Sequence, residues 1–194
     1  MPTRPRGLVL PSADGVTTLA RRVPHGVVGV ISPFNFPFLL TSRATLPALA
    51  CGNAVVLKPA PRPPLSGGVL LALLLQPAGL PAGVLQMLPG DAEAGEALVT
   101  DPDVAMVSFT GSTAVGRRVG ELAGRHLKKV ALELGGKNAL IVLDDADMDL
   151  AVCGGAWASW LHQGQICMSA GRHLVHEKVA AEYTRRMAEK ARAL

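Results

Sequence analysis

Short apolar runs alternate with longer helix-like stretches along most of this chain, and this alternation constrains its fold more than any other feature. The apolar runs cover residues 26–32, 53–58, 84–88, 105–109, 130–134 and 139–143. The helix-like stretches cover residues 37–50, 65–75, 92–100, 112–123, 148–162 and 177–194. Unbroken apolar runs are typical of parallel strands buried on both faces, and strand–helix alternation is the pattern of βαβ units. The sequence therefore predicts an α/β fold built on a doubly wound parallel sheet.

The first part of the chain stands outside this alternation. Residues 8–23 form two extended arms around Ala13, Asp14 and Gly15, which favour a turn. We therefore expect a projecting hairpin within residues 1–25. A first domain is placed over residues 26–134, and the start of a second domain over residues 135–194.

The composition excludes several classes of protein. Apolar residues make up 49% of the 194 residues and charged residues 18%, which is typical of a globular and not of a disordered chain. The net charge is +4 without a long basic run, so nucleic acid is not an expected partner. No apolar run is long enough to cross a membrane or to form a signal peptide. Three cysteines are too few for a disulfide framework and favour a reducing, cytoplasmic compartment.

Two of the cysteines lie in contrasting surroundings. Cys167 lies among small and polar residues, which form turns more readily than they form a core. Such surroundings indicate a thiol that is held on a loop for chemistry. Cys51 follows the mainly apolar residues 46–50, so it is interpreted as a buried structural cysteine.

Further candidates stand where the apolar runs end. Asn35 lies between aromatic residues and prolines, where its amide can donate to an oxyanion, although a simple turn asparagine shows the same pattern. Lys58 stands at an edge where α/β proteins bind ligands, or is simply a surface lysine. Glu133 precedes two glycines, either as a general base or as the charged end of a strand. The turn at residues 110–112 can cap a helix and bind phosphate through free backbone N–H groups.

Taken in order, these residues and their flanking motifs resemble the aldehyde dehydrogenase superfamily. The matching segments are SPFNFP, GNAVVLKPA, VSFTGSTAVG, LELGGKNALIVLDDADMDLAV and GQICMSAGR. The resemblance covers residues 7–194, and RRVPHGVVGVISPFNFP and GQICMSAGRHLVHE are most similar to the branch that oxidises benzaldehyde-type and vanillin-type aldehydes. It implies a Rossmann-like cofactor domain over 26–134, the first part of an α/β catalytic domain over 135–194, and homo-oligomers in intact relatives, with the arms of residues 1–25 used for oligomerisation.

The resemblance implies an enzyme that oxidises an aldehyde, here an aromatic one, to a carboxylic acid. Cys167 would attack the aldehyde carbon to give a thiohemiacetal, whose hydride passes to NAD or NADP and leaves a thioester. Asn35 and the backbone N–H of Cys167 would stabilise the oxyanion. Glu133 would activate the water that releases the acid.

The resemblance also implies a cofactor site and a substrate tunnel. Lys58 is expected to hold ribose hydroxyls, Ser112 the diphosphate, and Gly90 the adenine side. The cofactor residues that it implies are Ser32, Pro33, Phe34, Lys58, Ala60, Arg62, Gly90, Phe109, Thr110, Gly111, Ser112, Val115, Gly116, Leu134 and Gly135. The residues implied for the substrate tunnel are Phe36, Leu40, Arg43, Trp157 and Leu161, of which Arg43 would meet a ring hydroxyl or a nearby carboxylate. No metal site is expected.

Two departures from the family pattern leave questions open. Pro61, followed by Arg62, stands where NAD-preferring members carry a glutamate, so the choice between NAD and NADP is open. The chain also resembles only the middle of full-length members, as an internal fragment does. We therefore expect it to be a poor dehydrogenase by itself, with apolar surface around residues 69–75 that lacks neighbours.

Two other functions stay open at this point. The first is a truncated nucleotide-binding module without catalysis of its own. The second is a cysteine acyl-transfer enzyme, which would need a histidine beside the thiol. His162, His173 and His176 are near Cys167 in sequence, and the latter two are expected in a strand that leaves its loop.

Overall fold

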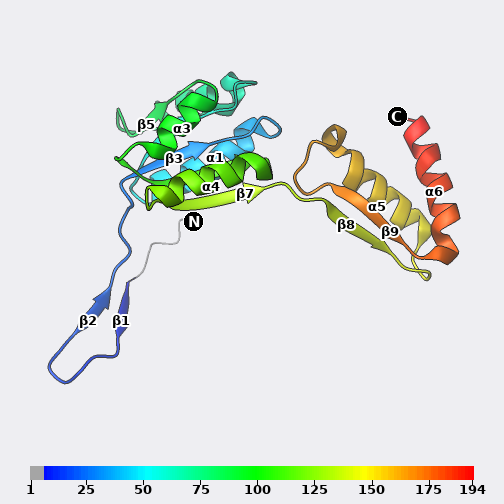
Figure 1. Cartoon of the computed structure of the whole chain (residues 1–194), viewed down its shortest axis with the longest axis horizontal. Helices are drawn as coiled ribbons and strands as arrows, with labels where there is room; N and C mark the ends of the chain where they lie inside the picture. Colours follow the sequence, from blue (N-terminus) through cyan, green and yellow to red (C-terminus); the bar gives the residue numbers. More distant parts are fainter. Residues whose placement is uncertain (1–6) are drawn as a thin grey trace. The chain divides into compact units, whose positions relative to one another are not determined.

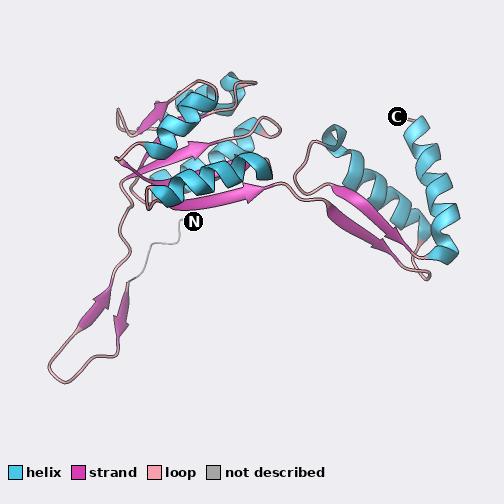
Figure 2. Cartoon of the chain, viewed as in Figure 1, coloured by secondary structure: helices cyan, strands magenta, loops and turns pink. Residues whose placement is uncertain are grey.

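The computed structural model describes residues 7–194 and divides after Glu133 into two compact units. Figure 1 traces the order of their elements, and Figure 2 shows that helices and strands alternate in both. The predicted α/β class is confirmed. The unit boundary lies one residue before the boundary predicted at residue 134.

The first described residues form a separate hairpin. Strands β1 (Leu8–Leu10) and β2 (Thr18–Ala20) pair antiparallel, and the amide of Val16 donates to the carbonyl of Ala13 at the turn. These strands pair only with each other, not with the larger sheet. Residues 1–6 of the predicted arm lie outside the described residues.

A five-stranded sheet forms the centre of the first unit. Its strands lie in the order β5-β4-β3-β6-β7, and β3 pairs in parallel with both β4 and β6. The chain thus builds outward on one side of β3 and then, after β5, outward on the other side. Open α/β sheets bind ligands at the carboxyl edge where the strand order reverses, which here lies between β3 and β6. The strand bounds are Val27–Ile31 (β3), Ala54–Lys58 (β4), Leu85–Met87 (β5), Val104–Gly111 (β6) and Lys129–Leu134 (β7).

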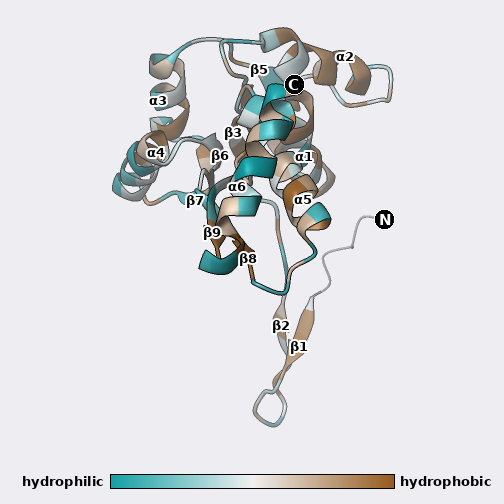
Figure 3. Ribbon diagram, turned by 90° about the vertical axis from the view of Figure 1, so that its right-hand side faces the viewer, coloured by the Kyte–Doolittle hydropathy of each residue, from teal (hydrophilic) through white to brown (hydrophobic). Residues whose placement is uncertain are grey.

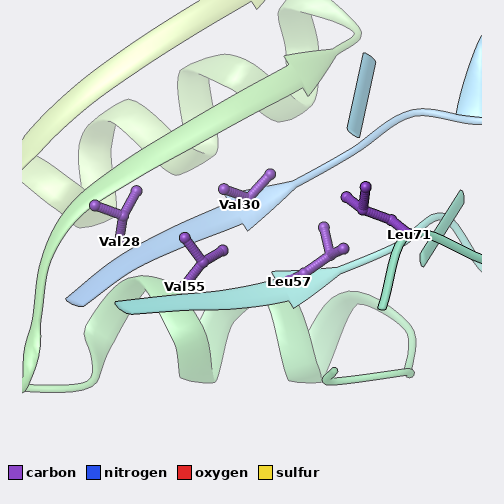
Figure 4. Packing of buried hydrophobic residues seen from close by; sticks show 5 residues of the cluster. All are labelled: Val28, Val30, Val55, Leu57 and Leu71. Carbon is purple, nitrogen blue, oxygen red and sulfur yellow. The ribbon is translucent and has the colours of Figure 1, made fainter. Parts of the chain in front are cut away.

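Helices cover the two faces of this sheet. On one face, Val28 and Val30 of β3 pack with Val55 and Leu57 of β4 under α1 (Pro37–Ala50) and α2 (Leu70–Leu75) (Figure 4). On the other face, α3 (Ala92–Thr100) comes so close that a side chain at Gly29 would lie 3.0 Å from Leu98. Helix α4 (Thr113–Arg125) lies beside α3. Because strand side chains alternate between faces, β3 contributes to both layers.

The stretch at residues 65–75 is not one regular helix. It begins as a π-helical turn, η1 (Leu65–Val69), and becomes α-helical only at Leu70. The hydroxyl of Thr41 donates to the carbonyl of Gly67 at 2.7 Å and so competes with the helical amides for that acceptor. Insertion of a side chain into a helical ladder is a known cause of such irregular turns.

The leucines of α2 are largely uncovered in this chain. Leu71 packs into the core, but Leu70, Leu73 and Leu74 keep 44%, 59% and 53% of their surface exposed. Figure 3 shows α2 as a strongly hydrophobic segment. The expected exposure of apolar surface around residues 69–75 is therefore present.

The second unit is built on one βαβ crossover and a final helix. Strands β8 (Asn138–Val142) and β9 (Ala170–Val175) pair in parallel, with α5 (Met148–Trp160) between them in sequence and α6 (Glu177–Arg192) after them. Its core is centred on Val142, Val152 and Tyr183. The carboxylate of Asp147 caps α5 by accepting the amides of Asp149 and Leu150.

Helix α5 ends two residues earlier than the predicted residue 162. A short 3₁₀ segment, η2 (Leu161–Gly164), follows it, and His162 and Gln163 both have a φ of 54°. Such left-handed backbone cannot continue a right-handed helix. No helix within residues 7–194 has the length and hydrophobicity needed to span a bilayer.

Candidate functional site

Two loops at the carboxyl edge of the sheet are tied together through Ser32. The amide of Ser32 donates to the carbonyl of Lys58 at 3.1 Å, which joins the ends of β3 and β4. The hydroxyl of Ser32 lies 2.6 Å from the hydroxyl of Thr41 in α1 and donates to it, because Thr41 gives its one proton to the carbonyl of Gly67. Ser32 and Lys58, both implied as cofactor residues, are thus buried side by side at the carboxyl ends of β3 and β4. Pro33 and Ala60 are half-buried beside them in sequence, whereas Phe34 and Arg62 are exposed.

Lys58 is a buried cation, and only 6% of its surface is exposed. Its ammonium donates to the carbonyl of Pro59, and its methylene stem lies against Gly95 of α3. Burial lowers the pKa of Lys58, and the nearby carboxylate of Asp91 opposes that effect. A buried ammonium with a single carbonyl acceptor retains donors for a ligand.

We expect Lys58→Met to raise the melting temperature of the chain at pH 7. Because the pKa of Lys58 is lowered, the folded chain binds this proton less tightly than the unfolded chain does, so the charge costs stability at neutral pH. That cost disappears as the pH rises through the lowered pKa toward 10.5, and the gain from methionine should shrink accordingly. Thermal unfolding followed by circular dichroism at pH 7 and pH 10 measures both effects. Lys190→Met, at an exposed position in α6, is the control, and a lower melting temperature for Lys58→Met at pH 7 would contradict the argument.

A cleft of about 380 Å³ opens between α3 and α4 beside the ends of β3 and β6. Phe109 and Val115, two of the predicted cofactor residues, line it. An ion pair between Arg118 and Glu96, at 3.0 Å, links the two helices there, and the bond to Glu96 raises the pKa of Arg118. Other lining residues were not predicted from the sequence, namely Ile31, Ala92, Gly95, Val99, Ala114, Val119 and Leu122. Ile31 ends β3, and the others lie on α3 and α4, where helical spacing is the one signal that marks them.

The turn between β6 and α4 is shaped for close approach to its backbone. A side chain at Gly111 would lie 2.6 Å from the ring of Phe109, so this position accepts only glycine without rearrangement. The hydroxyl of Ser112 caps α4 by accepting the amide of Val115. Gly116 is buried in the first turn of the helix, and Thr110 is half-buried. Gly90, which is expected on the adenine side of the cofactor, has a φ of 154°. A side chain at this position would clash with Ala94.

The segment that carries Asn35 leads directly into α1. Asn35 is half-buried and precedes Phe36, the N-cap residue of that helix. Leu40 and Arg43 follow at helical spacing from Phe36 and so share one side of α1, whereas Thr41 and Thr45 are buried on another. Three of the residues implied for the substrate tunnel therefore lie along one stripe.

Glu133 is the penultimate residue of β7, at an edge of the five-stranded sheet, and its side chain is exposed. Leu134 is half-buried and Gly135 exposed where the second unit begins. Asn35 and Glu133 belong to the first unit and Cys167 to the second. The convergence of these three groups on one reaction centre therefore stays a prediction.

Cys167 lies in a tight turn with an exposed side chain. The turn is closed by the amide of Ser169, which donates to the carbonyl of Ile166 at 3.0 Å. The amide side chain of Asn138 donates to the carbonyl of Cys167 at 3.3 Å, so the start of β8 holds the turn from one side. The thiol is thus presented on an ordered loop, as its surroundings in the sequence indicate.

The interpretation of Cys51 as a buried cysteine is wrong. Its side chain is exposed at the C-terminal end of α1. Gly52, with a φ of 86°, turns the chain immediately afterwards, so residue 51 lies at the helix end and not in the core. Cys51 lines a second cleft of about 740 Å³, together with Arg22, His25 and Lys129.

The remaining tunnel candidates lie in the second unit. Trp157 and Leu161 follow one another at helical spacing at the end of α5, and 67% and 41% of their surfaces are exposed. With Leu150, which is 72% exposed, they form an uncovered apolar stripe along this helix.

The histidines near Cys167 have other partners. Both ring nitrogens of His173 are engaged, one by Ser159 at 2.8 Å and the other by Tyr183 at 2.7 Å. His173 lies in β9 as expected, but His176 is the N-cap residue of α6, where its ring accepts the amide of Lys178. Neither ring is available as the base of a cysteine acyl-transfer site. Among residues 7–194, no group of three or more His, Cys, Asp or Glu side chains is placed to hold a metal ion.

Comparisons with known proteins agree with the resemblance seen in the sequence. The model of the aldehyde dehydrogenase family matches residues 1–194. A vanillin dehydrogenase from Amycolatopsis sp. is 60% identical over 98% of this chain and 39% of its own length. A benzaldehyde dehydrogenase [NAD(+)] from Pseudomonas putida is 55% identical over the same shares.

A solved structure is also similar throughout. The crystal structure of an NAD-dependent benzaldehyde dehydrogenase from Corynebacterium glutamicum superposes with a TM-score of 0.89 at 49% identity, over 96% of this chain and 41% of that one. The chain thus spans about two fifths of the length of the proteins that it matches.

Proposed function

The chain belongs to the aldehyde dehydrogenase family, and from this membership we propose that it forms the nucleophile-bearing and cofactor-binding part of an enzyme that oxidises aromatic aldehydes to carboxylic acids. The observation that carries the proposal is the ordered turn that presents an exposed Cys167 thiol in a member of this family. The names of the relatives, which act on vanillin and benzaldehyde, support the aromatic substrate class.

The chemistry follows from the thiol. The Cys167 thiolate forms a bond to the aldehyde carbon, and the carbonyl π electrons move to oxygen, which gives a thiohemiacetal. Asn35 and the backbone N–H of Cys167 donate hydrogen bonds to that oxygen. A nicotinamide cofactor, when bound, would supply the oxidant by accepting the hydride from the former aldehyde carbon. The result on Cys167 is a thioester.

Release of the acid needs a water and a base. Glu133 takes a proton from the water while the oxygen of the water attacks the thioester carbon. The carbon–sulfur bond then breaks, which returns the Cys167 thiolate and frees the carboxylic acid. The exposed position of Glu133 beside a glycine pair, at a strand end, supports this role.

The cleft between α3 and α4 fits the adenine end of NAD or NADP. Its lining by Ile31, Val99 and Val115 suits a flat apolar ring. We propose that Lys58 binds the ribose hydroxyls and that the turn at residues 110–112 binds the diphosphate. The turn suits this role because Gly111 has no side chain to block the backbone and because the N-terminus of α4 presents free amides. The other cofactor residues that the family implies within the first unit, from Ser32 to Gly116, are assigned to the same site.

The hairpin and the cysteines support two further parts of the proposal. Leu8, Val9 and Leu19 are at least half exposed on β1 and β2, which suits strands that pack against another copy in an intact enzyme. All three cysteines are free thiols, which suits a reducing, cytoplasmic setting.

A chimera tests the substrate class. The 191 matched residues of the Amycolatopsis vanillin dehydrogenase are replaced by those of this chain, and the parent enzyme is the control. We expect the chimera to oxidise benzaldehyde with a kcat/KM at least about tenfold above that for acetaldehyde, because the apolar residues Leu40, Trp157 and Leu161 bind a ring better than a methyl group. Equal values for the two aldehydes would contradict the aromatic assignment.

We expect the same chimera to use NADP at least as well as NAD. Pro61 leaves no carboxylate to repel a 2′-phosphate, and the exposed Arg62 can pair with one. Pro61→Glu should then lower kcat/KM for NADP relative to NAD by about tenfold or more, because it restores a like charge. Ala82→Glu adds the same charge at an exposed position elsewhere and is the control. A strong preference for NAD that Pro61→Glu leaves unchanged would contradict this.

The second candidate is a nucleotide-binding module without catalysis. The observation in its favour is that the chain spans only 39% of its relatives. Mass spectrometry of the chimera after incubation with benzaldehyde and cofactor separates the two. An acyl group trapped on Cys167 supports the dehydrogenase, whereas bound cofactor without any acylation supports the module.

A further inference from the structure

A series of three hydrogen bonds crosses the second unit and ends at the loop that carries Cys167. Tyr183 of α6 meets Nδ1 of His173 at 2.7 Å, Nε2 of His173 meets the hydroxyl of Ser159 at 2.8 Å, and Ser159 meets the carbonyl of Ala170 at 3.0 Å. This series, the Ser159 relay, links α6, β9 and α5, three elements that are separate in sequence.

The protons in the Ser159 relay can be arranged in only one direction. The carbonyl of Ala170 can only accept, so Ser159 must give it its single hydroxyl proton. Ser159 must then accept from Nε2 of His173, which therefore carries a proton. In the neutral ring Nδ1 is then bare and accepts the phenol proton of Tyr183. The neutral ring of His173 is thereby held as the Nε2-protonated tautomer.

The tyrosine end is built to donate. Tyr183 is 97% buried, and burial raises the pKa of its phenol, so it keeps its proton. The phenol oxygen lies directly over Gly155 of α5, where even one added methyl group would clash with it. Its ring is tilted by 59° against the ring of His173, with centroids 5.7 Å apart.

The serine end lies where the nucleophile loop becomes a strand. Ala170 is buried and is the first residue of β9, three residues after Cys167. From the other side, Asn138 holds the carbonyl of Cys167, and Arg172 donates to the carbonyl of Lys137 at 2.9 Å. The loop is therefore fixed at both of its sides, and the relay supplies the bond from α5.

We propose that Ser159, His173 and Tyr183 are positioning residues for the nucleophile, which act through a one-way hydrogen-bond relay that anchors the exit of the Cys167 loop to α5 and α6. The proposal rests on the proposed function in that Cys167 is taken as the nucleophile. The relay touches neither the thiol nor the cofactor, and its contribution is to keep the turn at residues 166–169 in one arrangement.

The first test is the tautomer in the unmodified 194-residue chain. Nitrogen-15 NMR of labelled histidine distinguishes a ring protonated at Nε2 from one protonated at Nδ1. We expect the neutral ring of His173 to be protonated at Nε2. Protonation at Nδ1, or rapid exchange between the two tautomers, would overturn the relay, and this result does not depend on any variant folding.

The second test is amide hydrogen exchange of the loop, in pairs of variants. Ser159→Ala and His173→Leu each break the relay, and we expect them to speed exchange at residues 166–172 by about tenfold. Ser159→Thr keeps the hydroxyl, and His173→Gln keeps one donor and one acceptor, so both should restore most of the protection. Loss of protection that is equal within each pair would show that packing alone matters, and would overturn the proposal.

Amide exchange within α5 provides an internal control for the integrity of that helix. The amides of residues 152–156 are hydrogen-bonded inside the helix, so they exchange when it opens. Their rates should stay within about twofold of the unmodified chain while the loop exchanges faster. Faster exchange in α5 along with the loop would mean that the whole helix has opened and would count against a local positioning role.

These measurements use neither aldehyde nor cofactor, so they fail independently of the proposed function. If the chain shows the expected tautomer and exchange but Cys167 of the chimera is not acylated, the relay holds and the dehydrogenase assignment fails. If Cys167 of the chimera is acylated but the chain has the other tautomer, the dehydrogenase assignment holds and the relay fails.

Discussion

Cys167→Ser should lower aldehyde turnover in the chimera by at least about a thousandfold. A serine hydroxyl at this place keeps the size of the side chain but stays protonated at neutral pH, so it is a far weaker nucleophile than a thiol. Appearance of the reduced cofactor at 340 nm measures the rate. Because Cys167 is exposed and in a turn, the substitution should leave the melting temperature almost unchanged.

The other two cysteines are matched controls for that result. Cys51 and Cys153 are also exposed free thiols, but one ends α1 and the other lies within α5. Replacing either by serine should leave more than half of the activity. If Cys167→Ser retains a tenth of the turnover, or if Cys51→Ser loses as much as Cys167→Ser does, the assignment of the nucleophile is wrong.

Leu57→Ala should destabilise the chain by about 2–5 kcal/mol. Leu57 is fully buried in β4, at the centre of the cluster with Val30, Val55 and Leu71 (Figure 4). Truncation to alanine removes apolar burial and leaves a cavity that the two rigid strands cannot close. Urea unfolding followed by far-ultraviolet circular dichroism gives the change in the free energy of unfolding.

Leu73→Ala is the control for this loss. Leu73 is chemically identical but 59% exposed on α2, so the same truncation there should change the free energy of unfolding by less than about 0.5 kcal/mol. A loss at Leu73 comparable to that at Leu57 would mean that α2 is covered in solution, for example by another copy of the chain.

Local patterns predicted most of the elements. The helices at residues 37–50 and 92–100 have the predicted bounds, because Pro37 can start a helix and Gly52 and Asp101 follow the ends of these two. The prediction of one regular helix over residues 65–75 is wrong because of a contact from elsewhere in the chain. The π-helical turn at Gly67 depends on Thr41, which lies 26 residues away. No pattern within residues 65–75 predicts this turn.

The candidate site also has some features that local sequence patterns predict and others that depend on contacts between distant elements. The strand-end positions of Asn35, Lys58 and Glu133 follow from apolar runs and their flanking loops, which are local features of the sequence. The burial of Lys58 and the lowering of its pKa depend on α3, because Gly95 packs on its side chain and Asp91 lies nearby. Such an effect has no local signature, since it arises from the desolvation of one element by another.

By itself the sequence determined the α/β class, the order of strands and helices, the family, and the loop on which Cys167 lies. The fold class and the order of the elements depend on the periodicity of apolar residues and on turn chemistry, which act between residues close in sequence, whereas the family follows from the resemblance of the motifs. Only the tertiary structure decided that α3 and α4 enclose a cleft and that Tyr183, His173 and Ser159 form one relay. Those results require residues from distant elements to meet at hydrogen-bond or packing distance, and that geometry is set by how the folded layers pack and not by any short segment.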